Sequence, residues 1–133
     1  MKLAVFWLAL GCAVTHQALA LDDGDGLRVY ERNCLNCHQA DGQGVPGMQP
    51  GLVNSPWLAA DGTALAAFVL SGGFDSLSRT DGGSDNFMPP FRHLENRELA
   101  AVLSYIRAEF GVTADPVTVR EVEAARATEP AAE

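Results

Sequence analysis

The sequence Cys34-Leu35-Asn36-Cys37-His38 restricts what this chain can fold around more than any other feature does. Two thiols separated by two residues can add to the two vinyl groups of one porphyrin, and the adjacent histidine is then held where it can bind the iron. The motif therefore predicts one covalently attached haem c, with Cys34 and Cys37 as the attachment residues and His38 as an axial ligand.

Other chemistries use the same cysteine spacing. A redox-active dithiol would be expected in a thioredoxin-like βαβ context, which the sequence does not suggest. A zinc site would need a fourth ligand besides Cys34, Cys37 and His38. In an oxidising compartment the two cysteines could also form a disulfide, and the adjacent His38 is what favours haem over that pairing.

The first twenty residues have the features of an export signal. Lys2 supplies a minimal positive region, residues 3–14 are apolar, and Ala18-Leu19-Ala20 is a small-residue cleavage site. We therefore expect a mature chain that starts at Leu21 and is periplasmic. The alternatives are a short anchor that stays uncleaved and a lipoprotein anchored to the membrane through Cys12, although residues 9–11 make a poor lipidation signal.

Export would leave Cys34 and Cys37 as the cysteines of the mature chain. It would also remove Lys2, which takes the formal charge from −8 to −9. Such an acidic chain is not expected to bind nucleic acid or an anionic membrane, and it suits a protein partner with a basic docking surface. The charge is equally consistent with a role in keeping an exported protein soluble.

The length of 133 residues suggests one domain. Apolar residues recur with helical spacing in three segments, and we expect helices over residues 26–37, 64–71 and 96–110. We place the domain at residues 21–112. Residues 113–133 form a C-terminal tail in which 118–127 has the pattern of a further short helix, either docked on the body or free.

The segments between these helices carry further candidate residues. A backbone carbonyl near Pro50, in the glycine- and proline-rich loop 39–52, is placed to accept the Nδ1 proton of His38. The indole N–H of Trp57 is a candidate partner for a haem propionate, and a packing role is equally consistent with its position. The polar loop 74–87 loosely resembles a calcium site, but it lacks the EF-hand spacing, and a solvated loop is the better interpretation; the residues concerned are Asp81, Asp85 and Asn86.

Met88 is the candidate for the second axial ligand. It lies fifty residues after His38, in the proline-stiffened segment Met88-Pro89-Pro90-Phe91 between two predicted helices. A thioether ligand favours ferrous iron and raises the reduction potential. Met48 is too close to the motif and lies in a turn, whereas His93 is the rival ligand, at the edge of the next helix.

These features together resemble the class I (mitochondrial-type) cytochrome c family. The resemblance rests on Gly26 and Tyr30 in the first helix, the motif at 34–38, the segment 88–91 and Leu103-Ser104-Tyr105-Ile106 in the last helix, and it covers roughly residues 25–111. The loop after the motif and the helical tail are most similar to single-haem domains of cytochrome subunits of bacterial periplasmic dehydrogenases and respiratory enzymes. Gly51 departs from that pattern, since a second proline often precedes Leu52 there.

The resemblance implies an all-α fold of three to five short helices around one haem. The first and last helices should cross, with Gly26 and Tyr30 meeting the segment around Tyr105. His38 and Met88 would be the iron ligands of an electron carrier that transforms no small-molecule substrate. Its partners would be redox proteins, a periplasmic dehydrogenase as donor and a terminal oxidase or reductase as acceptor.

Two other functions remain open. In the first, the sixth iron position opens and the protein is a gas sensor or a peroxidase-like enzyme. In the second, the chain is an interaction module without haem, in which Cys34 and Cys37 form a disulfide. The state of Met88 separates the carrier from the sensor, and covalently bound haem separates both from the module.

Overall fold

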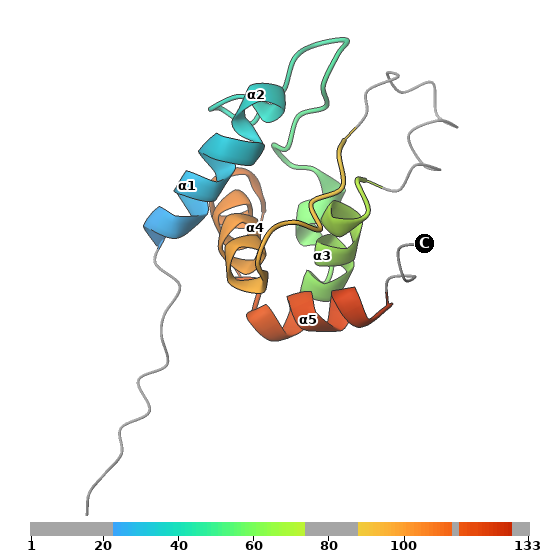
Figure 1. Cartoon of the computed structure of the whole chain (residues 1–133). Helices are drawn as coiled ribbons and strands as arrows, with labels where there is room; N and C mark the ends of the chain where they lie inside the picture. Colours follow the sequence, from blue (N-terminus) through green and yellow to red (C-terminus); the bar gives the residue numbers. More distant parts are fainter. Residues whose placement is uncertain (1–22, 74–87, 113–114, 129–133) are drawn as a thin grey trace, which may run out of the picture.

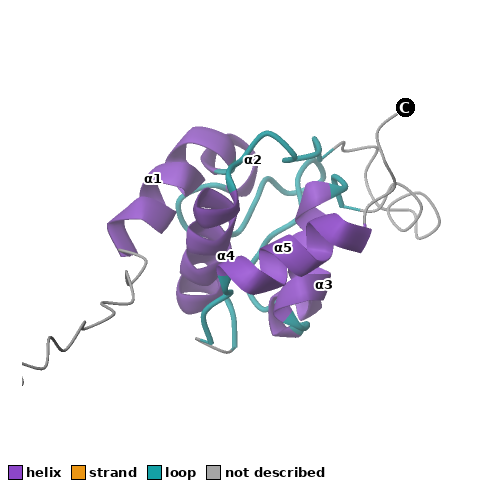
Figure 2. Cartoon of the chain, turned by 60° about the horizontal axis from the view of Figure 1, so that its bottom comes forward, coloured by secondary structure: helices purple, strands orange, loops and turns teal. Residues whose placement is uncertain are grey.

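The computed structural model describes residues 23–73, 88–112 and 115–128, in which the regular elements are helices (Figure 1). Figure 2 shows the same chain with helices and loops and no strand in the described part; a single isolated bridge joins Val45 and Gln49. The predicted all-α class is confirmed. The elements in chain order are α1 (Asp23–Asn33), α2 (Leu35–His38), the 3-10 helix η1 (Pro56–Ala59), α3 (Gly62–Leu70), α4 (Asn96–Phe110) and α5 (Val119–Thr128).

Sequence periodicity located most helices to within two residues, with one error. The helix expected over residues 26–37 begins earlier, at Asp23, and is interrupted at Cys34. Cys34 has φ −118° and ψ −31°, outside regular helical values, so a separate four-residue helix follows it. The Cys34 N–H still donates to the Tyr30 carbonyl at 2.8 Å, so α2 continues from α1 with a local change of direction.

Helix α4 is the centre of the core. Leu99, Ala100 and Leu103 on its inner face are almost completely buried. Before its first turn, the Glu95 N–H donates to the Glu98 carboxylate at 3.1 Å, which satisfies one of the free N–H groups that begin a helix. Helices α1 and α3 both pack on α4.

Helices α1 and α4 touch at a glycine. A side chain at Gly26 would place its Cβ 2.5 Å from the Ala101 carbonyl oxygen and 2.7 Å from the Tyr105 Cβ, so only glycine allows this approach. One turn later, the rings of Tyr30 and Tyr105 lie with their centroids 5.5 Å apart. The expected meeting of Gly26 and Tyr30 with the segment around Tyr105 is confirmed.

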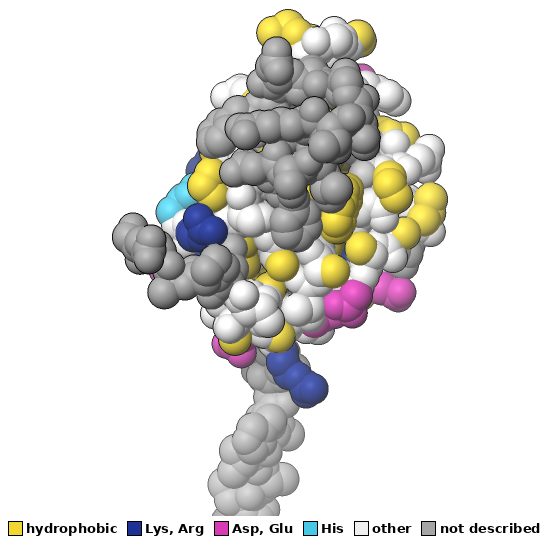
Figure 3. Space-filling view, turned by 90° about the vertical axis from the view of Figure 1, so that its right-hand side faces the viewer, with side chains coloured by type: hydrophobic (Ala, Val, Ile, Leu, Met, Phe, Trp, Pro, Cys, Tyr) yellow, Lys and Arg dark blue, Asp and Glu magenta, His cyan; other side chains and the backbone are white. Residues whose placement is uncertain are grey.

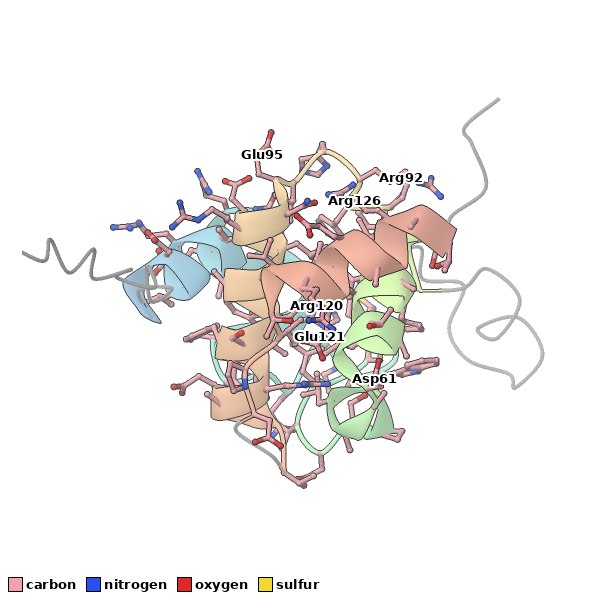
Figure 4. All side chains as sticks on the ribbon, turned by 90° about the horizontal axis from the view of Figure 1, so that it is seen from below. Asp61, Arg92, Glu95, Arg120, Glu121 and Arg126 are labelled. Carbon is pink, nitrogen blue, oxygen red and sulfur yellow. The ribbon has the colours of Figure 1, made fainter. Side chains whose placement is uncertain are left out.

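Helix α5 packs across α3 and α4 (Figure 4). Val117, Val122 and Ala125 are completely buried and belong to the same core as α4. The Val117 N–H donates to Ser104 Oγ at 2.9 Å, which fixes the start of this segment to α4. Residues 117–128 are thus docked on the body of the protein.

Some predictions concern residues outside the described ranges. These are the export signal at 1–20, lipidation of Cys12 and the polar loop with Asp81, Asp85 and Asn86. Within residues 23–73, 88–112 and 115–128, no helix has the length and apolar character needed to cross a bilayer.

Candidate functional site

The two cysteines and the histidine of the motif lie on one helical turn. Cys34 precedes α2, and its carbonyl accepts hydrogen bonds from the N–H groups of Cys37 at 3.1 Å and His38 at 2.9 Å. Both cysteines are half-buried, and neither is in a disulfide. A two-residue spacing on a tight turn thus presents two separate thiols together with an adjacent imidazole.

The environment of Cys34 does not suit a redox-active dithiol. Burial, and to a smaller extent the neighbouring Cys37, raises the pKa of the Cys34 thiol to about 11. A thiol with such a pKa is protonated at neutral pH, whereas a nucleophilic redox cysteine needs a lowered pKa. The site therefore favours covalent attachment of haem over a thioredoxin-like redox role for the two cysteines.

His38 is oriented by a backbone carbonyl. Its Nδ1 lies 3.0 Å from the Pro50 carbonyl oxygen, so the hydrogen bond expected from the sequence is present. Burial lowers the pKa of His38, and the Pro50 contact opposes that shift in part. The neutral ring donates from Nδ1 and keeps the lone pair of Nε2 for a metal, which is the arrangement that metal-binding histidines use.

Trp57 lies on η1 and stacks on Phe68 of α3. The ring centroids are 4.1 Å apart and the rings are 19° from parallel. This contact is the packing role that the sequence left open for Trp57, and its bond to a haem propionate stays a prediction. The stacking of Trp57 on Phe68 was not predicted, because a ring contact between two elements leaves no local sequence pattern.

Met88 is half-buried and packs against the core, whereas its two rivals lie at the surface. Its Sδ is in contact range of the turn that ends α3, since a Cβ added to Gly73 would lie 3.5 Å from it. Met48 is 60% exposed, and His93 is exposed with its ring 5.9 Å from that of Phe91. Burial therefore separates Met88 from the other two candidates.

The described residues fit a large flat apolar group next to the motif. Half-buried apolar side chains pack against the core, and they come from several elements: Cys34, Leu35, Leu52, Trp57, Ala67, Val69, Met88, Tyr105 and Val119. In Figure 3, hydrophobic side chains reach the surface at several places on the side where α3 lies. The apolar surface, two free thiols and an oriented imidazole together match the donor set and the surroundings that a haem c requires.

Arg126 of α5 is a residue that sequence reasoning missed. Its guanidinium bonds to the segment that follows Met88, at Asn96, Arg92 and Leu94. No sequence signal marks it, because its partners lie thirty or more residues away and two of them are backbone carbonyls.

A cavity of about 440 Å³ lies elsewhere, between α1 and α4. Its lining is charged and includes the ion pair Arg32–Glu98, whose nitrogen and oxygen are 3.1 Å apart. None of the candidate site residues lines it, so the chemistry suggested by the motif is not located there.

Comparisons with known proteins agree with this geometry. The family model described as Cytochrome c matches residues 24–109. Cytochrome c-552 of Thermus thermophilus is 35% identical over 118 residues, which is 82% of this chain and 79% of that protein. The cytochrome c subunit of the quinone alcohol dehydrogenase of Gluconobacter oxydans is 36% identical, and the fructose dehydrogenase cytochrome subunit of Gluconobacter japonicus is 31% identical. Each match covers 77% of this chain but spans only 22% of the Gluconobacter subunit.

Proposed function

The chain belongs to the cytochrome c family, and on that premise we propose that it is a periplasmic electron carrier with a single haem ligated by His38 and Met88. The family carries covalently bound haem c and transfers electrons. A single haem suits the size of the domain. The observation that carries the proposed ligation is the hydrogen bond between His38 Nδ1 and the Pro50 carbonyl, which prepares the ring as a neutral ligand.

The roles of the chain's own residues follow from their positions. Cys34 and Cys37, on one helical turn, would hold the haem covalently, and the Pro50 carbonyl fixes the orientation of His38. Met88, which lies in a proline-stiffened segment, would supply a thioether to the iron. The stack of Trp57 on Phe68 would add apolar surface to the surroundings of the haem. When bound, haem c supplies a one-electron couple between ferric and ferrous iron.

Iron held by both His38 and Met88 would suit electron transfer better than catalysis. A site with two protein ligands has no open position for substrate, and its ligands need little rearrangement when the iron changes oxidation state. We therefore propose a carrier, or the electron-transfer subunit of a larger oxidoreductase, in preference to an enzyme. No contact in the described residues favours the alternative of an open sixth position for gas or peroxide.

For the partners, we propose a dehydrogenase as donor and a terminal oxidase or reductase as acceptor. The support for the donor is the similarity to cytochrome subunits of two dehydrogenases, although each match spans about a fifth of the subunit. The acidic chain, at −8 overall, suits partners with basic docking surfaces. Export through residues 1–20 would place the carrier in the periplasm.

The test is the optical signature of methionine ligation. The oxidised holoprotein should show the weak long-wavelength charge-transfer band of a methionine–iron bond, and Met88→Ala should abolish it. Met48→Ala is the matched control, because Met48 is 60% exposed, and the band should persist there. A wild-type protein without the band, or one whose ferrous form binds carbon monoxide readily, would contradict the carrier. Release of all haem by acid–acetone would contradict covalent attachment.

A further inference from the structure

Arg126 connects the C-terminal helix to the segment that carries Met88. Its Nε donates to Asn96 Oδ1 at 2.7 Å, and its Nη1 donates to the Arg92 carbonyl at 3.2 Å. Its Nη2 donates to the Leu94 carbonyl. Figure 4 shows Arg126 reaching from α5 toward the chain around Arg92 and Glu95. One half-buried guanidinium thus binds three points within five residues of the chain.

The segment 88–95 is also held from the side of α3. The Phe91 N–H donates to the Val69 carbonyl at 3.4 Å, and the side chains of Phe91 and Leu94 are both buried. Nearer to the ligand, Gly72 has φ +79°, and a Cβ there would lie 2.6 Å from the Met88 carbonyl oxygen. The backbone of Met88 therefore sits directly on the turn that ends α3.

Between these two attachments stand Pro89 and Pro90, which lack an N–H and have restricted φ angles. Because this connection is stiff, a displacement of the backbone at Phe91–Leu94 also moves Met88. The hydrogen bonds of Arg126 come from a charged donor, which places them in the stronger class. Removing them would leave the segment held from the side of α3 alone, by the Phe91 N–H and the buried side chains of Phe91 and Leu94.

We propose that Arg126 is a positioning residue for the sixth ligand, and that α5 acts through it to keep Met88 on the iron. The inference rests on the proposed function, because it takes Met88 as the ligand. It gives the C-terminal helix a role in the redox site, although this helix lies away from the motif. Without the Arg126 contacts, the methionine would leave the iron more often and other ligands would bind more easily.

The experiment measures how tightly imidazole, a competing sixth ligand, binds the oxidised holoprotein. Spectrophotometric titrations are made well below the unfolding temperature on wild type, Arg126→Gln, Arg126→Lys and Arg120→Gln. Arg120 is the matched control, since it lies on the same helix, is exposed and makes no hydrogen bond or ion pair with segment 88–95 among the described residues. We expect imidazole affinity to rise about tenfold in Arg126→Gln, which corresponds to about 1.4 kcal/mol.

Arg126→Lys should fall between wild type and Arg126→Gln, because lysine keeps the charge but loses the planar fork of donors. Arg120→Gln should match wild type. Should Arg126→Gln fail to fold, Asn96→Ala removes one acceptor and leaves the two carbonyl bonds, and a smaller rise of about threefold is expected.

Two negative results are distinguishable. If wild type shows the methionine band and imidazole binds Arg126→Gln, or the folded substitute Asn96→Ala, no more tightly than it binds Arg120→Gln, the positioning role is overturned while Met88 ligation stands. If wild type lacks the methionine band, the proposed ligation fails, and the role of Arg126 fails with it. A loss of thermal stability alone, with unchanged imidazole affinity, counts as the first of these results.

Discussion

His38 Nδ1 lies 3.0 Å from the carbonyl oxygen of Pro50, a residue twelve positions further along the chain. The loop between them folds back on itself, with the Val45–Gln49 bridge at its tip and a hydrogen bond from the Gly44 N–H to the His38 carbonyl at 3.1 Å. The loop therefore brings its own carbonyl to the imidazole, and the basicity of His38 depends on the conformation of a segment without regular structure.

Substitution of Gly44 should disturb this contact. Gly44 has φ +68°, and a Cβ there would lie 2.3 Å from the Gln49 oxygen and 2.6 Å from the Pro50 oxygen. In Gly44→Ala the Pro50 carbonyl must move, and its hydrogen bond with His38 is weakened. The imidazole then donates less electron density to the iron, so it stabilises the ferric state less. We expect a higher reduction potential, measured by redox titration, and a loss of about 2 kcal/mol or more in the free energy of unfolding.

Gly47→Ala is the matched control for that substitution. Gly47 has a similar φ of +74°, but a Cβ there would meet nothing within 4 Å. Gly47→Ala should lower the free energy of unfolding by only the backbone cost of about 1 kcal/mol, and it should leave the reduction potential unchanged. Equal potentials in the two variants would show that the Pro50 carbonyl does not tune the iron.

Tyr30 should make the protein less stable in alkali. Burial first, and then Cys34, raises the pKa of Tyr30 to about 12, and burial persists when Cys34 is a thioether. Between pH 10 and 12 the unfolded chain therefore loses this proton while the folded chain keeps it. The free energy of unfolding should fall across that window, by about 2 kcal/mol at most.

Denaturant titrations of wild type and Tyr30→Phe at several pH values measure that dependence. The variant loses the hydrogen bond from the Tyr30 hydroxyl to the Gln39 carbonyl, so it should be less stable at neutral pH. Its stability should nevertheless fall less steeply above pH 10. Parallel curves would assign the alkaline loss to other groups, among them Tyr105, whose pKa burial also raises.

Val122 should contribute to global stability as a core residue does. It is completely buried where α5 meets α3 and α4. Val122→Ala removes two methyl groups and should lower the free energy of unfolding by about 2 kcal/mol. Val112→Ala, at a residue that is 73% exposed, should change it by less than about 0.5 kcal/mol. Equal effects in chemical denaturation would mean that α5 is not part of the cooperative unit.

Electron transfer should respond to salt according to the charge of the reagent. With a formal charge of −8, the protein attracts cations and repels anions. Raising ionic strength from about 0.01 M to about 0.15 M shortens the screening length from about 30 Å to about 8 Å. Stopped-flow oxidation of the reduced holoprotein by a cationic cobalt(III) complex should slow, and oxidation by ferricyanide should accelerate. Two flat profiles would remove the electrostatic argument for a basic partner surface.

Local chemistry made much of this protein predictable. Helix periodicity placed α3, α4 and α5, because each has an apolar stripe that depends only on nearby residues. The cysteine and histidine spacing indicated the site for the same reason, since one helical turn brings those groups together. The break at Cys34 was missed because the residues on either side of it are all compatible with a continuous helix.

Local sequence patterns were therefore enough to identify the helices and the chemistry of the motif. The packing of the helices was needed to show which carbonyl orients His38, which ring stacks on Trp57, and that α5 belongs to the core. It was also needed to show that Arg126 bonds to the segment that follows Met88 in the chain. These contacts join residues far apart in the chain through backbone atoms and ring faces that every sequence offers, so their partners are selected by how the helices pack and not by any local pattern.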